Sequence, residues 1–450
     1  MPALKDIARD QAGLGLETLR ALVRQPSVAA TGEGVAECAA LVRRTFEDAG
    51  ARVQVYTRID APPLIVAEFP GAGDRTLLFY NHYDVQPPDP LHEWTSPAFE
   101  PATRNGCLYG RGVADNKGDL VSRLAAVRAL QAAHGRLPCR VKFVVEGEEE
   151  IGSVHFGAYV QASRGALAAD ACIWEFGQRD LKERLQVTLG VKGICYLDLE
   201  LQATSRDLHS SLGAIVEGAG TQMAWALASL KDPKTGRVLV DGFYDRVRPP
   251  TARELEATRR LPFDEAELKQ HIGVERFIGG VTGFEAQVQL LYHPTCTVCG
   301  LESGYTGPGS KTVLPRRARA KVDFRLVPDQ DPQEILRLVQ AHFARLGVEI
   351  SARLLGGERA YRTDLDDPFV ALVVATAQEA TGRDVTVYPT SAGTGPMYDL
   401  GTALRIPIVS LGGGYWGSRA HAPDEHIRLA DFEETIYLMA RLIERFAGLP

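Results

Sequence analysis

The chain reads Thr76-Leu77-Leu78-Phe79-Tyr80-Asn81-His82-Tyr83-Asp84 where an apolar run meets a polar end. Such a run is typical of a central β-strand that is buried on both faces. Chemistry in parallel α/β sheets gathers at the carboxyl ends of the strands, where His82 would lie. We interpret His82 as a candidate metal ligand, with Asp84 placed to hold its other ring nitrogen. A lone loop histidine is the simpler alternative for this tripeptide alone.

Carboxylates follow the other segments that read as buried strands. Val141 to Val145 runs directly into a glutamate-rich stretch, and Ala171 to Trp174 ends in an acidic residue. Another acidic residue precedes a helix that apolar spacing predicts up to Gly135. Because the carboxyl ends of parallel strands share one sheet edge, we expect several polar side chains to meet there. They are His82, Asp115, Glu149, Glu150 and Glu175. An N-cap for Asp115 and a solvated helix face for the glutamates are the simpler alternatives.

The order of predicted elements indicates two domains, as 450 residues would suggest. Helices and buried strands alternate in residues 1–192 and again in 361–450, which predicts an α/β domain with a mostly parallel sheet flanked by helices. Residues 193–360 instead contain strands with one wet face, in the order β-α-β-β-α-β, which predicts an inserted α+β sandwich. One of those strands is expected around Ala286 to Val298. The charged segment 232–279 is interpreted as an excursion from this core.

Composition limits the classes of partner. The net charge is −7, with scattered lysines and arginines, which argues against binding nucleic acid or an anionic membrane surface. No eighteen consecutive apolar residues occur, and residues 1–11 lack the apolar core of a signal peptide. We therefore expect a cytoplasmic protein. The seven cysteines do not resemble a disulfide framework, and Cys296 and Cys299 lack the second pair that a zinc ribbon needs.

Two histidines and three carboxylates suffice for two divalent ions only if one carboxylate bridges both. His421 lies in a loop of the returning α/β domain and is the second histidine. Mixed nitrogen and oxygen ligands suit zinc and tolerate cobalt or manganese. Two such ions would activate a shared water and polarise a carbonyl, while a remaining glutamate could act as the base.

Six motifs resemble those of the di-zinc metallopeptidases that include carnosinase-type cytosolic dipeptidases, carboxypeptidase G, aminoacylase and succinyl-diaminopimelate desuccinylase. They are Asn81 to Val85, Tyr109 to Gly118, Glu146 to Ser153, Asp207 to Ser210, Gly307 to Pro315 and His421 to Glu425. The resemblance covers nearly the whole chain.

The resemblance implies a role for each candidate in the α/β domain. One metal would be held by His82, Asp115 and Glu175, and the other by Asp115, Glu150 and His421. Glu149 would be the catalytic base, and Asp84 would support His82. A cis peptide bond between Asp115 and Asn116 is also implied. Glu175 occupies a place that is often aspartate in the family.

The resemblance makes the insert a lid that carries a homodimer contact. His209 would stabilise the oxyanion at the metal site of the partner subunit, and Arg325 would bind the substrate's carboxylate. Gly393 and Thr394 lie where carnosinase-type relatives keep other residues, and we count them among the substrate-binding candidates. The simpler alternatives are an exposed loop histidine for His209 and a strand arginine on the wet face for Arg325.

The function that this resemblance implies is hydrolysis of an amide bond beside a free carboxylate, most simply in dipeptides. The first alternative is an N-acyl amino acid amidohydrolase. A noncatalytic metal-binding scaffold is an alternative of another class, but it would have no use for an unliganded Glu149. Dinucleotide binding is weaker, because Gly71-Ala72-Gly73 precedes a strand instead of following one.

Overall fold

A computed structural model describes residues 3–449. The chain divides into two compact units. Unit 1 comprises the described residues up to 190, residues 362–390 and the described residues from 396 onward; unit 2 comprises residues 191–361 and 391–395. Residues 391–395 were predicted to lie in the α/β domain but belong to unit 2. No helix within residues 3–449 combines the length and apolarity needed to cross a bilayer.

Unit 1 is built on a twisted sheet with β3 (Thr76–His82) near its centre. Every residue of β3 is buried, and β3 pairs in parallel with β6 (Arg140–Glu146) and β7 (Ala171–Trp174). The sheet order is β1-β2-β6-β3-β7-β19-β9-β8-β20, with β18 paired to β9. Its other strands are β1 (Arg52–Arg58), β2 (Ala61–Phe69), β8 (Gln178–Arg179), β9 (Leu185–Thr188), β18 (Val385–Tyr388), β19 (Ile408–Ser410) and β20 (Gly414–Tyr415). The predicted mostly parallel core is confirmed, with β1 and β2 as antiparallel strands at one edge.

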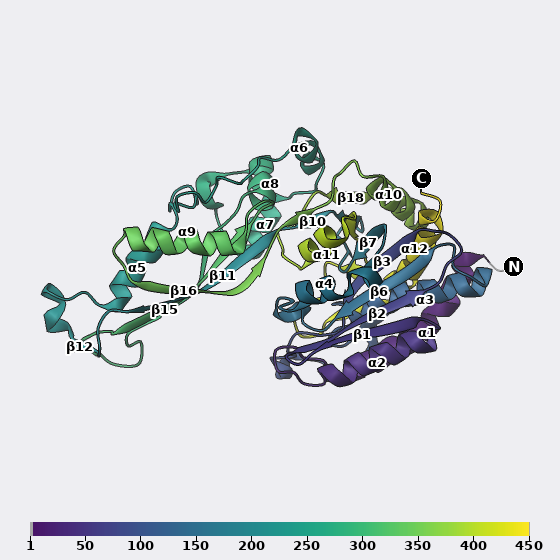
Figure 1. Ribbon diagram of the computed structural model, residues 1–450, viewed down its shortest axis with the longest axis horizontal. Helices are drawn as coiled ribbons and strands as arrows, with labels where there is room; N and C mark the ends of the chain where they lie inside the picture. The colour runs from purple at the N-terminus through teal and green to yellow at the C-terminus, as the bar shows by residue number, and fades with distance from the viewer. Residues whose placement is uncertain (1–2, 450) are drawn as a thin grey trace. The chain divides into compact units, whose positions relative to one another are not determined.

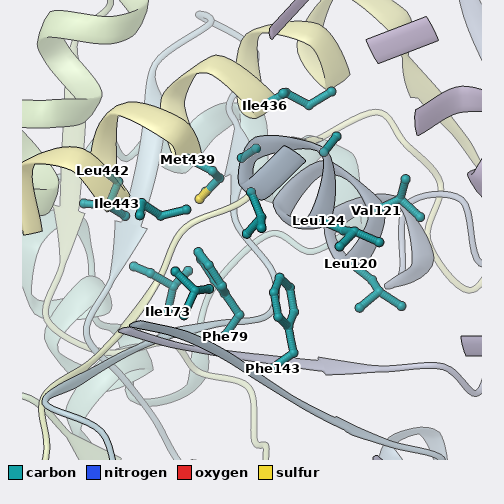
Figure 2. Packing of buried hydrophobic residues seen from close by; sticks show 14 of the residues in the cluster. Phe79, Leu120, Val121, Leu124, Phe143, Ile173, Ile436, Met439, Leu442 and Ile443 are labelled. Atoms are coloured by element: carbon teal, nitrogen blue, oxygen red, sulfur yellow. The ribbon is translucent and has the colours of Figure 1, made fainter. Parts of the chain in front are cut away.

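Helices cover both faces of this sheet. Successive side chains of a strand point to opposite faces, so neighbouring residues of β3 pack against different helices. Phe79 points to the face covered by α3 (Lys117–His134) and α12 (Leu429–Phe446), where Leu124 and Met439 lie close by (Figure 2). Tyr80 points to the opposite face, where its ring stacks on Trp174 and meets Phe156 of α4 edge-on. The helices of unit 1 are α1 (Leu4–Arg24), α2 (Val35–Asp48), α3, α4 (Phe156–Leu167), α10 (Pro368–Thr381), α11 (Met397–Leu404) and α12.

Short elements at the carboxyl edge of the sheet complete unit 1. A small antiparallel sheet is ordered β21-β5-β4, and two 3₁₀ turns lie in the loops. Their bounds are β4 (Ala102–Arg104), β5 (Cys107–Tyr109), β21 (His426–Arg428), η1 (Leu91–Glu93) and η2 (Glu149–Ile151). These elements carry or border the polar motifs of the sequence.

Unit 2 contains the predicted β-α-β-β-α-β arrangement. Its antiparallel sheet has the order β13-β15-β11-β16, and α9 lies along the sheet (Figure 1). Alternate residues of β11 and β15 are buried, because one face packs against helices and the other is wet. These elements are β11 (Gly193–Gln202), α5 (Ala219–Ser229), β13 (Thr297–Ser303), β15 (Arg317–Leu326), α9 (Pro332–Arg345) and β16 (Ile350–Glu358).

One predicted strand of unit 2 is wrong in its first half. Residues 283–292 form helix α8 (Gly283–Tyr292), and β13 begins only at Thr297. Apolar residues at 286, 288, 290 and 291 fit a short strand or a short helix, and packing against α6 selects the helix. The excursion before α8 holds α6 (Ala252–Arg259), α7 (Glu265–Ile272) and η4 (Ile278–Gly280). A separate loop cluster comprises β12 (Leu208–His209), η3 (Ser210–Ala214) and β14 (Val313–Leu314).

Candidate metal centre

His82 ends β3 with its imidazole completely buried. Its Nδ1 lies 3.1 Å from the backbone oxygen of Asp84 and 3.3 Å from Oδ1 of the same residue. An Nδ1–H that donates to Asp84 leaves Nε2 as an acceptor. The other carboxylate oxygen of Asp84 accepts a hydrogen bond from the backbone N–H of Glu150 at 3.0 Å. Asp84 therefore orients His82 and also fixes the start of the glutamate turn.

Asp115 lies between the two histidines. Its Oδ1 is 3.0 Å from Nε2 of His82, and its Oδ2 is 3.1 Å from Nε2 of His421. The N-cap of α3 is Asn116 without a side-chain cap bond, so Asp115 does not cap the helix. The Asp115–Asn116 peptide bond is cis, which confirms that prediction. A carboxylate with one oxygen toward each histidine has the arrangement that a bridging ligand needs.

The glutamates approach from neighbouring strand ends. Glu150 lies in η2 after β6, and its Oε2 is 3.1 Å from Nε2 of His421. Glu175 follows β7, and its Oε2 is 3.2 Å from Nε2 of His82. Two groups of side chains could each hold an ion: His82 with Glu149 and Glu175, and Asp115 with Glu150 and His421. Geometry alone therefore allows Glu149 as a ligand as well as a base.

The electrostatics of the cluster reflect crowded acids. Burial raises the pKa of Glu149 and Glu175 well above the usual carboxyl value, and other carboxylates add to the shift. Hydrogen bonds to Asp115 and Glu150 raise the pKa of His421 to about 10. Burial opposes ionisation of Asp115, but hydrogen bonds from His421 and His82 still lower its pKa. A positive charge at the centre of this cluster would stabilise every ionised carboxylate in it.

The donor set fits divalent cations. Oε2 of Glu175 and Oδ1 of Asp84 are buried without a hydrogen-bond partner among the described residues. With the ring proton of His82 on Nδ1, Nε2 is an acceptor that lies 3.0 Å from Oδ1 of Asp115 and 3.2 Å from Oε2 of Glu175. Three acceptors converging on one point are stabilised by a cation, and nitrogen with carboxylate oxygen is a typical zinc environment.

Several supporting residues were not predicted from the sequence. Arg123 of α3 is completely buried and donates to the backbone oxygens of Tyr80, Trp174 and Leu411, at 2.7, 2.7 and 3.1 Å. It thereby joins the carboxyl ends of β3 and β7 and the segment after β19. Gln86 donates from Nε2 to Oε2 of Glu150 at 2.9 Å. Arg123 lies within a predicted apolar helix, and a charged residue there was the available signal.

Glu425 is a third unpredicted support, although its motif was recognised. Its buried carboxylate accepts hydrogen bonds from Arg111 and from the backbone N–H groups of Gly112, Ala114 and Asp115. These bonds hold the loop that presents Asp115. The same motif contains His421, so one loop both supplies a candidate ligand and positions another.

The remaining predicted residues lie in unit 2. Nη1 of Arg325 donates to Oγ1 of Thr394 at 2.7 Å, and its Nε lies 3.1 Å from Oδ2 of Asp323. Gly393 accepts from the backbone N–H of Lys192 at 2.8 Å. His209 is exposed, and its Nδ1 accepts from the backbone N–H of Ser211 at 3.1 Å. The structure thus brings Arg325 and Thr394 together.

Comparison with known proteins places these features in context. The profile of peptidase family M20/M25/M40 matches residues 78–445. Human beta-Ala-His dipeptidase is 32% identical over 291 residues, which cover 62% of this chain and 56% of that protein. The matched region is thus under two thirds of that relative's length. The Cys-Gly metallodipeptidase DUG1 of Saccharomyces cerevisiae is 27% identical over 415 residues, covering 87% and 84%.

Solved structures show the same fold. The M20 family metallo-carboxypeptidase Sso-CP2 from Sulfolobus solfataricus is 39% identical, with a TM-score of 0.91 over 97% of this chain and 99% of that one. Human carnosine dipeptidase 1 is 25% identical, with a TM-score of 0.80 over 99% of both chains.

Proposed function

The chain belongs to peptidase family M20/M25/M40, and from this we propose that it is a metal-dependent dipeptidase that cleaves an amide bond beside a free carboxylate. The observation that carries the proposal is the position of Asp115, with one oxygen toward His82 and the other toward His421. The names of the relatives, beta-Ala-His dipeptidase and Cys-Gly metallodipeptidase, support a dipeptide as substrate.

In this proposal two divalent ions, zinc by preference, bind at the carboxyl edge of the sheet. His82, Asp115 and Glu175 would hold one ion, and Asp115, Glu150 and His421 would hold the other. When bound, such ions would supply Lewis acidity, which activates water as a nucleophile near neutral pH and polarises the carbonyl of the substrate. Asp84 keeps the Nδ1 proton on His82, so that Nε2 is free to bind.

Glu149 is the proton carrier. Burial raises its pKa above the usual carboxyl value, which suits a group that must accept a proton and then release it near neutral pH. Its carboxylate takes the proton from the attacking water and passes it to the leaving amine. Arg325 binds the substrate's carboxylate through its guanidinium, with Thr394 orienting it. His209 of the partner subunit in a homodimer stabilises the developing oxyanion.

The test compares substrate classes directly. The purified protein is stripped with a chelator, reloaded with zinc, manganese or cobalt, and given a dipeptide panel and an N-acyl amino acid panel. Dipeptide hydrolysis that needs reloading supports the proposal. Activity restricted to N-acyl amino acids would instead identify a deacylase. Tight metal binding without any hydrolysis would identify a scaffold.

A further inference from the structure

Unit 2 contains an apolar hollow of about 500 Å³, a volume typical of small-molecule sites. Its walls come mainly from α7, η4 and α8. Three of its apolar side chains are half exposed, at 52% for Ile272, 55% for Ile278 and 51% for Leu290. The apolar wall includes Phe263, Leu268, Ile272, Phe277, Ile278 and Leu290.

Two cations border this apolar wall. Nζ of Lys192 donates to the backbone oxygens of Leu290 and His293, at 2.7 and 2.6 Å, and so ties the end of α8 to the chain beside β11. Arg325 is 34% exposed, and its Nη2 has no hydrogen-bond partner within residues 3–449. Asp323 and Thr394 orient this guanidinium and leave its outer edge open to a carboxylate. Within residues 3–449, none of the side chains that line the hollow is acidic.

We propose that this hollow binds the side chain of the substrate residue whose free carboxylate Arg325 binds, and that the enzyme prefers large apolar residues there. This inference rests on the proposed dipeptidase function. The side chain and the carboxylate of one amino acid are attached to the same carbon, so a guanidinium that fixes the carboxylate also aims the side chain. Ile272, Ile278 and Leu290 are left in contact with water unless an apolar group covers them. A basic side chain would meet Lys192 and Arg325.

A substrate series measures this preference. The dipeptides Ala-Gly, Ala-Ala, Ala-Leu, Ala-Phe and Ala-Lys differ only in the residue that bears the carboxylate. Full burial of one methylene is worth about fourfold in binding, so kcat/KM should be at least about tenfold higher for Ala-Leu than for Ala-Ala. Ala-Phe should resemble Ala-Leu, and Ala-Lys should be poorer than Ala-Ala.

A matched pair of variants connects the preference to the hollow. Leu290→Gln makes the wall polar, whereas Leu301→Gln changes a leucine of similar exposure, 55%, in β13 of the same unit and away from the hollow. Both side chains are largely exposed, so both variants should unfold near the wild-type temperature. The Ala-Leu to Ala-Ala ratio of kcat/KM should fall at least about threefold in Leu290→Gln and stay unchanged in Leu301→Gln.

The outcomes separate this inference from the proposed function. Hydrolysis of all five dipeptides at similar kcat/KM would overturn the inference and leave a dipeptidase. The absence of any hydrolysis would refute the proposed function, and the hollow would then be tested by ligand-observed NMR titration with 4-methylpentanoate and propanoate, which contain no amide bond. Tighter binding of 4-methylpentanoate that Leu290→Gln weakens supports the inference; equal binding of both acids overturns it.

Discussion

Glu149 and Glu150 are neighbours in the sequence but have different surroundings. Glu150 contacts His421 and Gln86, whereas Glu149 lies with His82 and Glu175. Nothing in a run of glutamates distinguishes a ligand from a base. The distinction depends on which side chains of other strands each residue meets.

The first prediction separates these two roles. Glu149→Ala should retain two metal ions per chain but lose activity by about 10²- to 10⁴-fold, because it removes only the proton carrier. His82→Ala and Asp115→Ala should lower the metal content itself. Metal is measured by mass spectrometry and activity with one dipeptide. If Glu149→Ala loses metal as His82→Ala does, Glu149 is a ligand and another residue is the base.

The second prediction concerns Arg325. Arg325→Met should lower kcat/KM for dipeptides by about 10- to 100-fold, mainly through KM, since a hydrogen bond to a charged group is worth about 1.5 to 3 kcal/mol. Dipeptide amides lack the carboxylate, so they should be poor substrates for both proteins and respond little to the substitution. An equal loss on both substrate types would assign Arg325 a structural role only.

At the scale of secondary structure, the strand ends are held in place by α3. Arg123 donates to backbone oxygens from three different segments, and each oxygen is near the carboxyl edge of the sheet. One buried guanidinium thus supplies hydrogen-bond donors to the backbone of three segments at once. The position of His82 and Glu175 therefore depends on a helix residue that, within residues 3–449, forms no hydrogen bond with either side chain.

The third prediction follows from this arrangement. Arg123→Met should lower the free energy of unfolding by about 3 kcal/mol or more, because it removes hydrogen-bond donors from three backbone oxygens inside the protein. Arg128→Met is the control, since Arg128 lies in the same helix and is only partly buried. It should cost less than about 1 kcal/mol. Denaturant unfolding of both variants measures the difference. Equal losses of unfolding free energy in the two variants would contradict a special role for the hydrogen bonds of Arg123.

For the whole molecule, the metal centre links metal binding to stability. The chelated protein should unfold at a lower temperature than the loaded protein, because ions that bind only the folded state stabilise it by mass action. Adding zinc back should restore the unfolding temperature. An unchanged unfolding temperature after verified metal removal would contradict the proposed centre.

The fourth prediction gives this difference a pH dependence. In the metal-free protein the pKa values of Glu149, Glu175 and His421 are raised in the folded state, the last to about 10. The folded state then binds more protons than the unfolded state above the ordinary carboxyl and histidine pKa values, so stability falls as pH rises. The gap in unfolding temperature between loaded and metal-free protein should therefore widen from pH 6 to pH 9. A constant or narrowing gap would contradict it.

The fifth prediction tests the proposed homodimer and the role of His209. Glu149→Ala and His209→Ala proteins should each be nearly inactive. If His209 serves the partner subunit, mixing them yields about half mixed dimers with one intact site of two, and activity should recover to about one quarter of wild type. Subunit exchange is verified independently with tagged chains. If His209 serves its own chain, every site keeps one lesion and nothing recovers.

Local sequence patterns were sufficient to predict the main helices and strands of this protein. The helix that ends at Gly135 and the buried strand that ends at His82 follow from apolar spacing over a few residues, and the structure confirms both. The family resemblance rests on short motifs that are equally local. The apolar pattern of residues 286–292 suits either a strand or a helix, so only tertiary packing decides between them. The strand predicted there was wrong, because these residues form part of α8.

The approach of distant residues was decided by the tertiary structure. Asp115 faces both His82 and His421 because strand pairing and the loop held by Glu425 bring together positions more than 300 residues apart. Arg123 and Gln86 gave little signal, since their roles consist of hydrogen bonds to atoms far along the chain. The apolar hollow of unit 2 gave no signal, because most of its apolar wall lies in the charged segment 232–279, which the sequence sets apart from the core, and only folding brings that wall beside Arg325. Apolar periodicity in the sequence indicates which face of a helix or strand is buried. A functional site depends on which helices, strands and loops pack against each other, and that is set by contacts between distant parts of the chain.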